Sequence, residues 1–333
     1  MRGALDNPIV KILRNLLMLV LVLFAVSFIS FALIDASPID PVAAYVGHSG
    51  KDNLDLAELE RLQDYFGMNK SFGERYFNWL GGLLQGDMGV SLIHRQPVEQ
   101  VIGAKIASSL ILMLTAWALS GVLGFFLGVL AGVFRDSVLD KLIKGYSLLL
   151  ASAPTFWLAM LILIVFSVWL KLFPIGLSVP IGVLAKDVTF ADSIRHLILP
   201  AVTLSVIGIA NITLHTREKM IEIMGQDYIL YARSRGENLR GIVKKHGLRN
   251  VLLPAITLQF ASFSEIIGGS VLVEQVFSYP GLGQSAVSAG LRGDAPLLLG
   301  IVMVTAIMVF AGNMTANVLY GIVDPRIRRG LHG

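Results

Sequence analysis

The sequence predicts an all-α, polytopic membrane protein with six transmembrane helices. Hydrophobic residues make up 55% of its 333 positions and charged residues only 15%, and its mean hydropathy is +0.71. Soluble domains carry about 25% charged residues. Several uncharged stretches also reach the ~20 residues that a helix needs to cross a bilayer. These observations disfavour a soluble enzyme, and the lack of cysteine excludes disulfide bonds and thiolate metal sites.

Six apolar stretches bounded by charged residues define the expected spans. They are Leu16–Ile34, Ile106–Phe134, Gly145–Leu170, Leu197–Thr216, Asn250–Val273 and Ala295–Val323. The first is longer than the roughly 7–15 apolar residues of a signal peptide, and no clear cleavage site follows it. We therefore expect an uncleaved anchor there rather than a signal peptide. Pro154 in the third stretch and Pro200 in the fourth are expected to kink their helices.

Lysine and arginine residues indicate which segments face the cytoplasm. If both termini lie inside, the inner segments contain 17 of these residues, and the outer segments contain 10 over a greater total length. Cytoplasmic loops carry the excess of positive charge, so both termini are predicted to be cytoplasmic. The expected division is a cytoplasmic tail (1–15), a first transmembrane helix (16–34), an extracytoplasmic region (35–104), a five-helix core (105–323) that includes a cytoplasmic loop (217–253), and a cytoplasmic tail (324–333).

The extracytoplasmic region contains ten acidic residues and five basic ones. Within it, the segment 56–65 and the aromatic patch 76–80 are expected to form short helices at the surface. The aromatic patch is interpreted either as an anchor at the membrane interface, where tyrosine and tryptophan gather, or as a docking site for a partner.

No catalytic motif is present. The sequence lacks the phosphate-binding G-x-x-x-x-G-K-[ST] loop, the H-E-x-x-H zinc motif and the G-x-S-x-G hydrolase motif. Its six histidines never fall at ligand spacing, so we expect no metal site and no cofactor bound by this chain. The formal net charge of +4 is too small to indicate a nucleic-acid partner.

The cytoplasmic loop contains the most informative pattern. Residues Tyr228 to Arg235 favour a helix, and Gly236 is expected to end it, as a C-cap glycine does. A second short helix is expected from Leu239 to Lys245, and Pro254 suits the first turn of the fifth span. The loop is therefore predicted to be a basic, amphipathic helical hairpin. The alternative is a plain loop whose positive charges only fix its orientation.

This loop resembles the cytoplasmic motif of ABC importer permeases of the dipeptide, oligopeptide and nickel group. The similar patterns are Tyr-x-x-Tyr-Ala-Arg-Ser-Arg-Gly (228–236), His-x-x-Arg-Asn-x-x-x-Pro (246–254), Gly81–Gly89 with Ser91 and Pro97, Gly268–Glu274, Tyr279–Gly283 and Asp324–Arg326. The general importer motif begins with Glu-Ala-Ala, and Leu230 and Tyr231 stand in place of its first two residues, whereas Ala232 and Gly236 remain. This departure is usual in the peptide group.

The resemblance implies a type I ABC importer permease fold in the cytoplasmic (inner) membrane of a prokaryote. It implies that the chain forms half of a translocation pathway for peptides and binds no nucleotide. The implied partners are a second, similar permease, two ATPase subunits that bind ATP and Mg, and an extracytoplasmic substrate-binding protein. The residues implied to couple the pathway to the ATPases are Tyr231, Ala232, Arg233, Ser234, Arg235, Gly236, His246 and Arg249.

Other functions remain open at this point. Permeases of the same architecture import nickel, other metal chelates or oligosaccharides. A stand-alone secondary carrier is the alternative from a different class, although the halves of the sequence show no matched Gly/Pro-broken segments, which carriers often contain. A membrane-embedded enzyme is a third class, and it lacks a catalytic constellation.

Four features inside the spans have both a structural and a functional interpretation. Gly124, Gly128 and Gly132 lie four apart, a spacing that permits close helix packing or a moving interface. Glu265 is the carboxylate within a span, and such residues line transport paths or form structural bonds. Asn211 and His215, one turn apart on the fourth span, are candidates for the same path.

Overall fold

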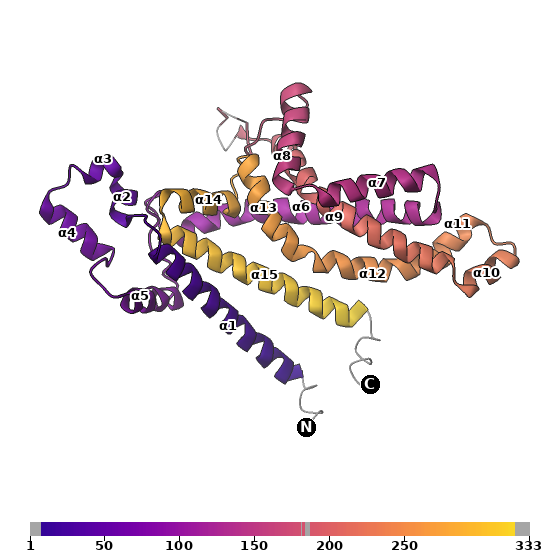
Figure 1. The fold of residues 1–333 in the computed structure, drawn as a ribbon, viewed down its shortest axis with the longest axis horizontal. Coiled ribbons are helices and arrows are strands. Elements are labelled where there is room, and N and C mark those ends of the chain that lie inside the picture. Colours follow the sequence, from indigo (N-terminus) through magenta and orange to yellow (C-terminus); the bar gives the residue numbers. More distant parts are fainter. Residues whose placement is uncertain (1–7, 181, 184–186, 324–333) are drawn as a thin grey trace. The chain divides into compact units, whose positions relative to one another are not determined.

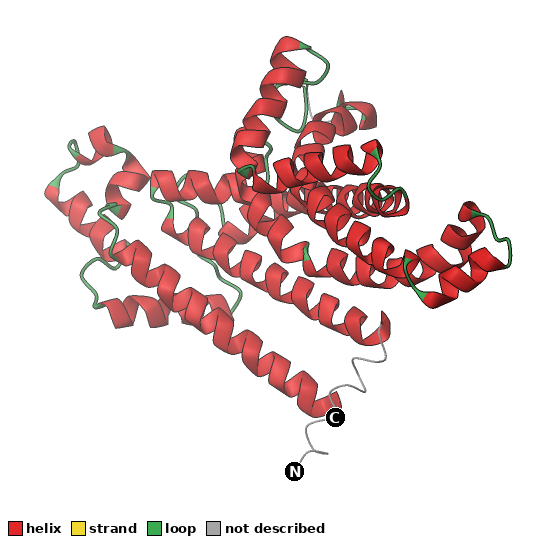
Figure 2. Cartoon of the chain, turned by 45° about the vertical axis from the view of Figure 1, so that its right-hand side comes forward, coloured by secondary structure: helices red, strands yellow, loops and turns green. Residues whose placement is uncertain are grey.

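The computed structural model describes residues 8–180, 182–183 and 187–323 of the chain. These residues form helices joined by short loops, without a strand (Figures 1 and 2). The helices are α1 (Pro8–Asp35), α2 (Pro41–Val46), α3 (His48–Lys51), α4 (Leu56–Tyr65), α5 (Phe72–Leu84), α6 (Val98–Val133), α7 (Val138–Ser152), α8 (Thr155–Leu163), α9 (Phe190–Met224), α10 (Asp227–Ser234), α11 (Leu239–Ile242), α12 (Leu248–Ala261), α13 (Phe263–Val276), α14 (Leu282–Arg292) and α15 (Ala295–Val323). The expected tail 324–333, with its Asp-Pro-Arg pattern, and the first seven residues lie outside the described residues.

Four helices are long and apolar enough to cross a membrane, namely α1, α6, α9 and α15. Two further candidates are bent pairs: α7 with α8 and the π-helical turn that follows it, and the segment Leu239–Ala261 with α13. Six spans result if each pair counts as one. The all-α fold is thus confirmed, whereas the membrane limits and the orientation of the termini stay predictions.

Three of the expected spans differ most from the helices in the structure, and α1 and α6 also begin earlier than their expected spans, at Pro8 and Val98. The third is not one helix, because α7 and α8 meet at 110°. Ala153 between them is extended (φ −87°, ψ 136°), since a following proline disfavours helical geometry. The fifth breaks at Ser262 with a bend of 49°. The fourth is longer than expected, because α9 continues through Pro200 for 35 residues, or about 50 Å.

The chain divides into two compact units, and the first contains residues 1–107 and 281–310. In it α1 packs on α5 through aromatic rings, with centroids 5.5 Å apart for Phe28 and Tyr76 and 5.6 Å apart for Phe31 and Phe72. Tyr76 is buried, and its hydroxyl lies 2.9 Å from Ser27 Oγ. Both interpretations of the aromatic patch are therefore wrong for Tyr76, although Phe77 beside it is exposed.

A buried carboxylate, Asp294, fixes a second part of the first unit. Asp294 precedes α15 and accepts hydrogen bonds from Ser91 Oγ (2.5 Å) and from the backbone nitrogens of Ile93 (3.0 Å) and Leu297 (3.2 Å). These bonds cap α15 and fix the loop before α6 to it. The adjoining apolar core consists of Val98, Val101, Ile102, Leu282, Ala289, Leu297 and Ile301.

The second unit contains residues 108–280 and 311–333, and the close approach of α6 to α9 lies at its centre. A Cβ atom added to Gly128 would lie 2.5 Å from Thr216 Cβ and 2.7 Å from the carbonyl oxygen of Thr213. Added Cβ atoms on Gly124 and Gly132 would also collide with α9, at 2.8 Å and 2.5 Å from the nearest atoms. We call this contact the glycine seam. It confirms that the four-residue spacing serves helix packing.

Helix α12 is joined to α6 by a reciprocal pair of hydrogen bonds. Trp117 Nε1 donates to the carbonyl oxygen of Gln259 (2.9 Å), and Gln259 Nε2 donates to the carbonyl oxygen of Trp117 (2.5 Å). In hydrocarbon such bonds replace water as the partner of polar groups. They fix the register of α12 against the same helix that forms the glycine seam.

We expect Gly128→Ala to destabilise the protein by about 1–3 kcal/mol, the usual cost of forcing extra atoms into a close-packed contact. The added methyl would meet a backbone carbonyl and a branched side chain, and neither can swing away. The matched control is Gly268→Ala, because a Cβ atom on this helical glycine meets nothing within 4 Å. Thermal unfolding in detergent measures both, and equal unfolding temperatures for the two variants would contradict the glycine seam.

Candidate functional site: the α10–α11 hairpin

The expected helical hairpin is present in the second unit, formed by α10 and α11. Its turn contains Gly236 with φ +82°, and no heavy atom lies within 4 Å of a Cβ built there. The turn thus needs glycine for its left-handed backbone and not for space. Asn238 Oδ1 caps α11 by accepting a hydrogen bond from Gly241 N (2.8 Å). The second helix is longer than predicted, because α11 continues through the π-helical segment Val243–Gly247 into α12.

The hairpin has its own small core, which joins it to α9. Ile229, Ala232 and Ile242 are buried together, and Met224 at the end of α9 packs against them. Met224 also packs against a second cluster formed by Val129, Met220, Ile223 and Val251. Ala232, a predicted coupling residue, therefore lies inside the hairpin. The structure provides a continuous apolar connection from the hairpin to the ends of α6, α9 and α12.

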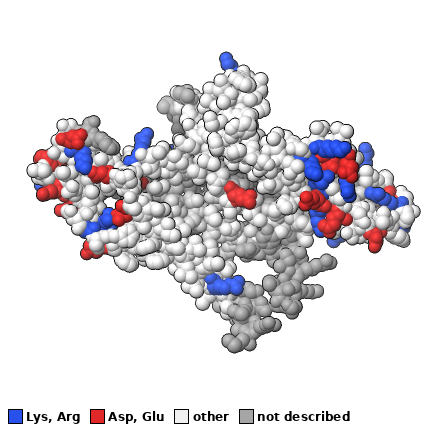
Figure 3. All heavy atoms as spheres, in the orientation of Figure 1, with Lys and Arg blue, Asp and Glu red and all other residues white. Residues whose placement is uncertain are grey.

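The outer face of α10 and its C-cap carry four of the eight predicted coupling residues. Tyr231 is 65% exposed, and Arg233, Ser234 and Arg235 are exposed beside it. Ser234 Oγ donates to the carbonyl oxygen of Tyr231 (2.8 Å), and the Arg235 guanidinium lies 5.9 Å from the centre of the Tyr231 ring. Figure 3 shows charged side chains gathered over the end of this unit that carries α10 and α11. This face offers rings and guanidinium groups that no described residue covers.

The base of the hairpin is fixed by polar contacts. Asn250 Nδ2 donates to the carbonyl oxygen of His246 (2.8 Å) and to the Tyr228 hydroxyl (3.3 Å). The imidazole of His246 is half-buried, with Nε2 3.7 Å from a carboxylate oxygen of Glu237. Arg249 is exposed. The structure thus brings the two predicted sequence patterns of the loop, which lie on either side of the turn, into contact.

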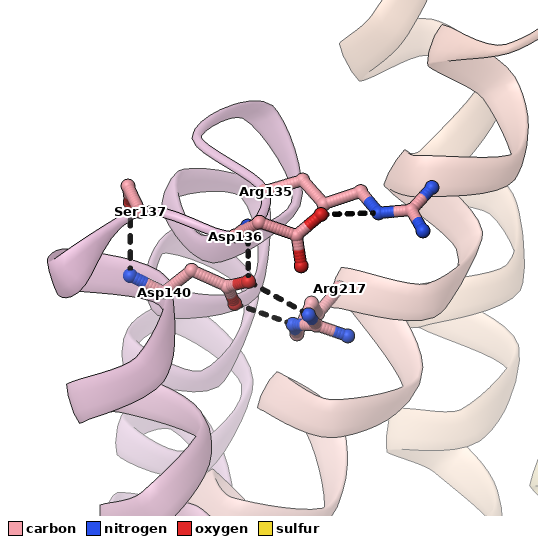
Figure 4. Close-up of polar contacts among 5 residues, drawn as sticks. All are labelled: Arg135, Asp136, Ser137, Asp140 and Arg217. Atoms are coloured by element: carbon pink, nitrogen blue, oxygen red, sulfur yellow. Dashed lines mark hydrogen bonds and ion pairs between the residues drawn. The ribbon is translucent and has the colours of Figure 1, made fainter.

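An ion pair that the sequence analysis did not find connects α7 to α9 (Figure 4). Arg217 Nε and Nη2 donate to the two carboxylate oxygens of Asp140 at 2.5 Å and 2.7 Å. Asp140 also accepts from the backbone nitrogen of Asp136 (2.8 Å). The two side chains are only 2% and 13% exposed. Nothing in the sequence pairs Arg217 with Asp140, because the two positions lie 77 residues apart.

The three residues predicted for the translocation path occupy different surroundings. His215 is exposed and lines a pocket of about 410 Å³ between α9 and α12, with Thr216, Glu218, Lys219 and Glu222 on the α9 side. Asn211 and Glu265 are not among the lining residues. Glu265 is exposed in the first turn of α13. Their assignment to a path stays a prediction.

Comparison with known proteins matches nearly the whole chain. The family model of the binding-protein-dependent transport system inner membrane component matches residues 124–329, and the model of the N-terminal part of this membrane component matches residues 9–109. The oligopeptide transport system permease protein AppB of Bacillus subtilis is 35% identical over 317 residues, which cover 95% of this chain and 98% of that protein. The dipeptide transport system permease protein DppB of Escherichia coli is 31% identical over 335 residues, with the same coverage.

A solved structure is similar in fold. A chain from the MetNI methionine ABC transporter, captured in inward facing conformations, superimposes with a TM-score of 0.54 and 18% sequence identity. The likeness covers 68% of this chain and 97% of that chain. At this identity it shows the fold alone.

We expect the Asp140–Arg217 pair to be strongly coupled. Asp140→Ala and Arg217→Ala should each cost about 3–5 kcal/mol, because each leaves a buried charge without its partner. The double variant should cost less than the sum, with a coupling energy of about 1–3 kcal/mol. The same cycle on Lys219 and Glu222, whose side chains are 36% and 58% exposed, should give less than about 1 kcal/mol. Unfolding in detergent measures both cycles, and additive effects at Asp140 and Arg217 would contradict the pairing.

Proposed function

Because the chain belongs to the family of binding-protein-dependent transport system inner membrane components, we propose that it forms half of the translocation pathway of an ABC importer for peptides. The observation that carries the proposal is the likeness to peptide permeases over 95% of the chain and 98% of their length. A likeness of that extent leaves no large part of either protein unmatched. The chain is accordingly a multi-pass protein of the inner membrane.

The proposed assembly contains a second, similar permease, two ATPase subunits and an extracytoplasmic substrate-binding protein. The family description names a binding protein as the component on which transport depends. The sequence has no phosphate-binding loop of its own, so ATP and Mg are assigned to the ATPase subunits. The exposed face of α10 is the surface that we assign to them.

In this proposal the hairpin acts as a lever. Its buried core and Met224 make it move as one body with the end of α9, since close-packed interiors transmit displacement. The guanidinium groups of Arg233 and Arg235 are suited to directional bonds with acidic or carbonyl groups of an ATPase. Closure of the ATPases around nucleotide would displace the hairpin, and packed helices respond to such a displacement by switching between discrete arrangements.

Peptides are the proposed cargo because the relatives are named for oligopeptide and dipeptide transport. Nickel, other metal chelates and oligosaccharides are the alternatives within the same architecture. A stand-alone secondary carrier is disfavoured, because the matched family depends on a binding protein. Specificity in such a system depends largely on what the binding protein delivers, so cargo is best tested on the whole assembly.

We expect the chain to co-purify from native membranes with ATPase subunits and a second permease. In liposomes that assembly and a peptide-loaded binding protein should together import peptide with ATP hydrolysis, whereas the pure chain should hydrolyse no ATP. Mass spectrometry of the ligand held by the co-purified binding protein identifies the cargo. ATP hydrolysis by the pure chain, or transport by the chain alone, would contradict the permease assignment. A metal chelate or a sugar as the ligand would contradict only the proposal that the cargo is a peptide.

We expect Arg235→Glu and Gly236→Val to reduce both peptide uptake and substrate-stimulated ATP hydrolysis at least ten-fold. The first reverses a charge on the proposed contact face, and the second strains a backbone at φ +82°, where a residue other than glycine costs about 1–2 kcal/mol. The binding protein should still dock, because neither change touches the spans.

Two matched variants separate coupling from general effects. Lys141→Glu reverses a positive charge, as Arg235→Glu does, but at an exposed position of α7 outside the hairpin. Gly225→Val changes a nearby glycine whose φ is −90° and whose added Cβ meets only ordinary contacts. Both controls should transport at rates close to the native rate. If the hairpin variants also transport normally at equal expression, the loop merely fixes orientation.

A further inference from the structure

The first unit contains a pocket that the proposed transport function does not use. It has a volume of about 850 Å³, within the range of about 300–1,000 Å³ that is typical of ligand sites. Apolar walls come from the end of α1 (Phe31, Ile34), from Trp79 of α5 and from the start of α15 (Leu298, Leu299). The pocket is therefore a site with an apolar interior formed by three helices and the loops between them.

The pocket lies at the end of two membrane-spanning segments. The apolar run of α1 stops at Asp35, and that of α15 starts at Ala295, and both residues line the pocket. Trp79 is of the type that gathers at membrane–water interfaces. Side chains of α1 next to this end, such as Leu33 and Ile29, are exposed. If α1 and α15 span the bilayer as predicted, the apolar interior lies where acyl chains and headgroups meet.

The charged groups of the pocket leave one cation unpaired. Arg75 Nη1 lies 2.6 Å from Asp35 Oδ1, and Asp40 is paired with Lys51. Lys70 also lines the pocket and is exposed. Its ammonium group forms no hydrogen bond or ion pair with another described residue, and Glu74 nearby is bound by Ser71 through a capping box. Asp35 and Asp40 are thus paired with Arg75 and Lys51, which leaves Lys70 as the cation of the pocket lining without a hydrogen-bonded carboxylate.

Arg75 adds a second unused donor. Its Nε atom is buried and has no hydrogen-bond partner among the described residues, although Nη1 is bound to Asp35. A buried donor without a partner costs free energy. A small shift of the guanidinium toward an anion in the pocket would satisfy it. The free donors of the pocket, the Lys70 ammonium group and Arg75 Nε, together with its aromatic and aliphatic walls, fit an amphiphile with an anionic headgroup.

We propose that this pocket binds a phospholipid of the membrane, with the phosphate beside Lys70 and Arg75 and the upper acyl chains against Phe31, Ile34 and the start of α15. Ammonium and guanidinium groups bind phosphate oxygens through charge-assisted hydrogen bonds. The free carboxylate of a peptide would satisfy the same cations. The lipid is favoured because the walls come from the ends of two spans, which acyl chains reach without leaving the bilayer.

The test uses the permease purified with the subunits that co-purify with it, stripped of lipid in detergent. Native mass spectrometry follows the binding of three probes: dioleoylphosphatidylglycerol, dioleoylglycerol without phosphate, and the dipeptide Ala-Phe. We expect one tight site for the phospholipid, at least ten-fold weaker binding of dioleoylglycerol, and no competition by the dipeptide. Equal binding of the two lipids, or displacement of the lipid by the dipeptide, would overturn the proposal.

Variants locate the site. Lys70→Glu should weaken phospholipid binding at least ten-fold, and Asn78→Trp, at an exposed position of the pocket wall, should abolish the tight site by filling it. Arg61→Glu is the control, because this residue is exposed on α4 and does not line the pocket. Transport is a separate readout, so a failed lipid test leaves the permease function intact. Unchanged binding in both pocket variants, or an equal loss in Arg61→Glu, would place the lipid elsewhere.

Discussion

The close approach of α6 and α9 at the glycine seam is the constraint on which the second unit depends. Three glycines face α9 so tightly that an added Cβ atom would lie 2.5–2.8 Å from the nearest atom. Lipid gives no hydrophobic drive for helix association, so such backbone contact supplies the attraction. With one side of α9 committed to α6, its remaining sides pack against α7, α8, α12 and α13. The seam therefore fixes the helix against which α7, α8, α12 and α13 pack.

The same constraint extends to the hairpin through one side chain. Met220 lies against Gly132 in the seam, and its Cε atom would be 2.7 Å from a Cβ atom built on Gly247. Gly247 ends the π-helical segment that joins α11 to α12. The segment that follows the hairpin is therefore in contact with a side chain of the seam. The Asp140–Arg217 pair connects α9 to α7. The part of α9 that precedes Met224 is therefore held by both α6 and α7.

Local signals in the sequence predicted the helices and the turn of the hairpin but not the breaks and partners. The length of the uncharged stretches identified the apolar segments. Gly236 indicated a turn because a left-handed backbone conformation depends on the residue itself and not on distant contacts. Pro154 indicated a kink, yet the 110° angle at α7 and α8 depends on what each helix packs against. Ser262 gives no sequence signal at all, because serine tolerates a helix as well as its end. Asp140 and Arg217 are far apart in the sequence, and no motif or spacing in a single sequence indicates that they form a pair.

In the hairpin, the residues that form the buried core differ from those that are exposed on its outer face. Ile229, Ala232 and Ile242 make its core, whereas Leu230 and Tyr231 are more than half exposed. Large exposed apolar side chains are expected on a helix that faces lipid. Leu230 and Tyr231, however, lie beside the exposed Arg233 and Arg235, whose charges are costly in hydrocarbon, so this face does not lie in lipid. Leu230 and Tyr231 thus add apolar area to a face that also carries guanidinium groups. The fold of the hairpin does not require this surface, which is the one that we propose for contact with an ATPase subunit.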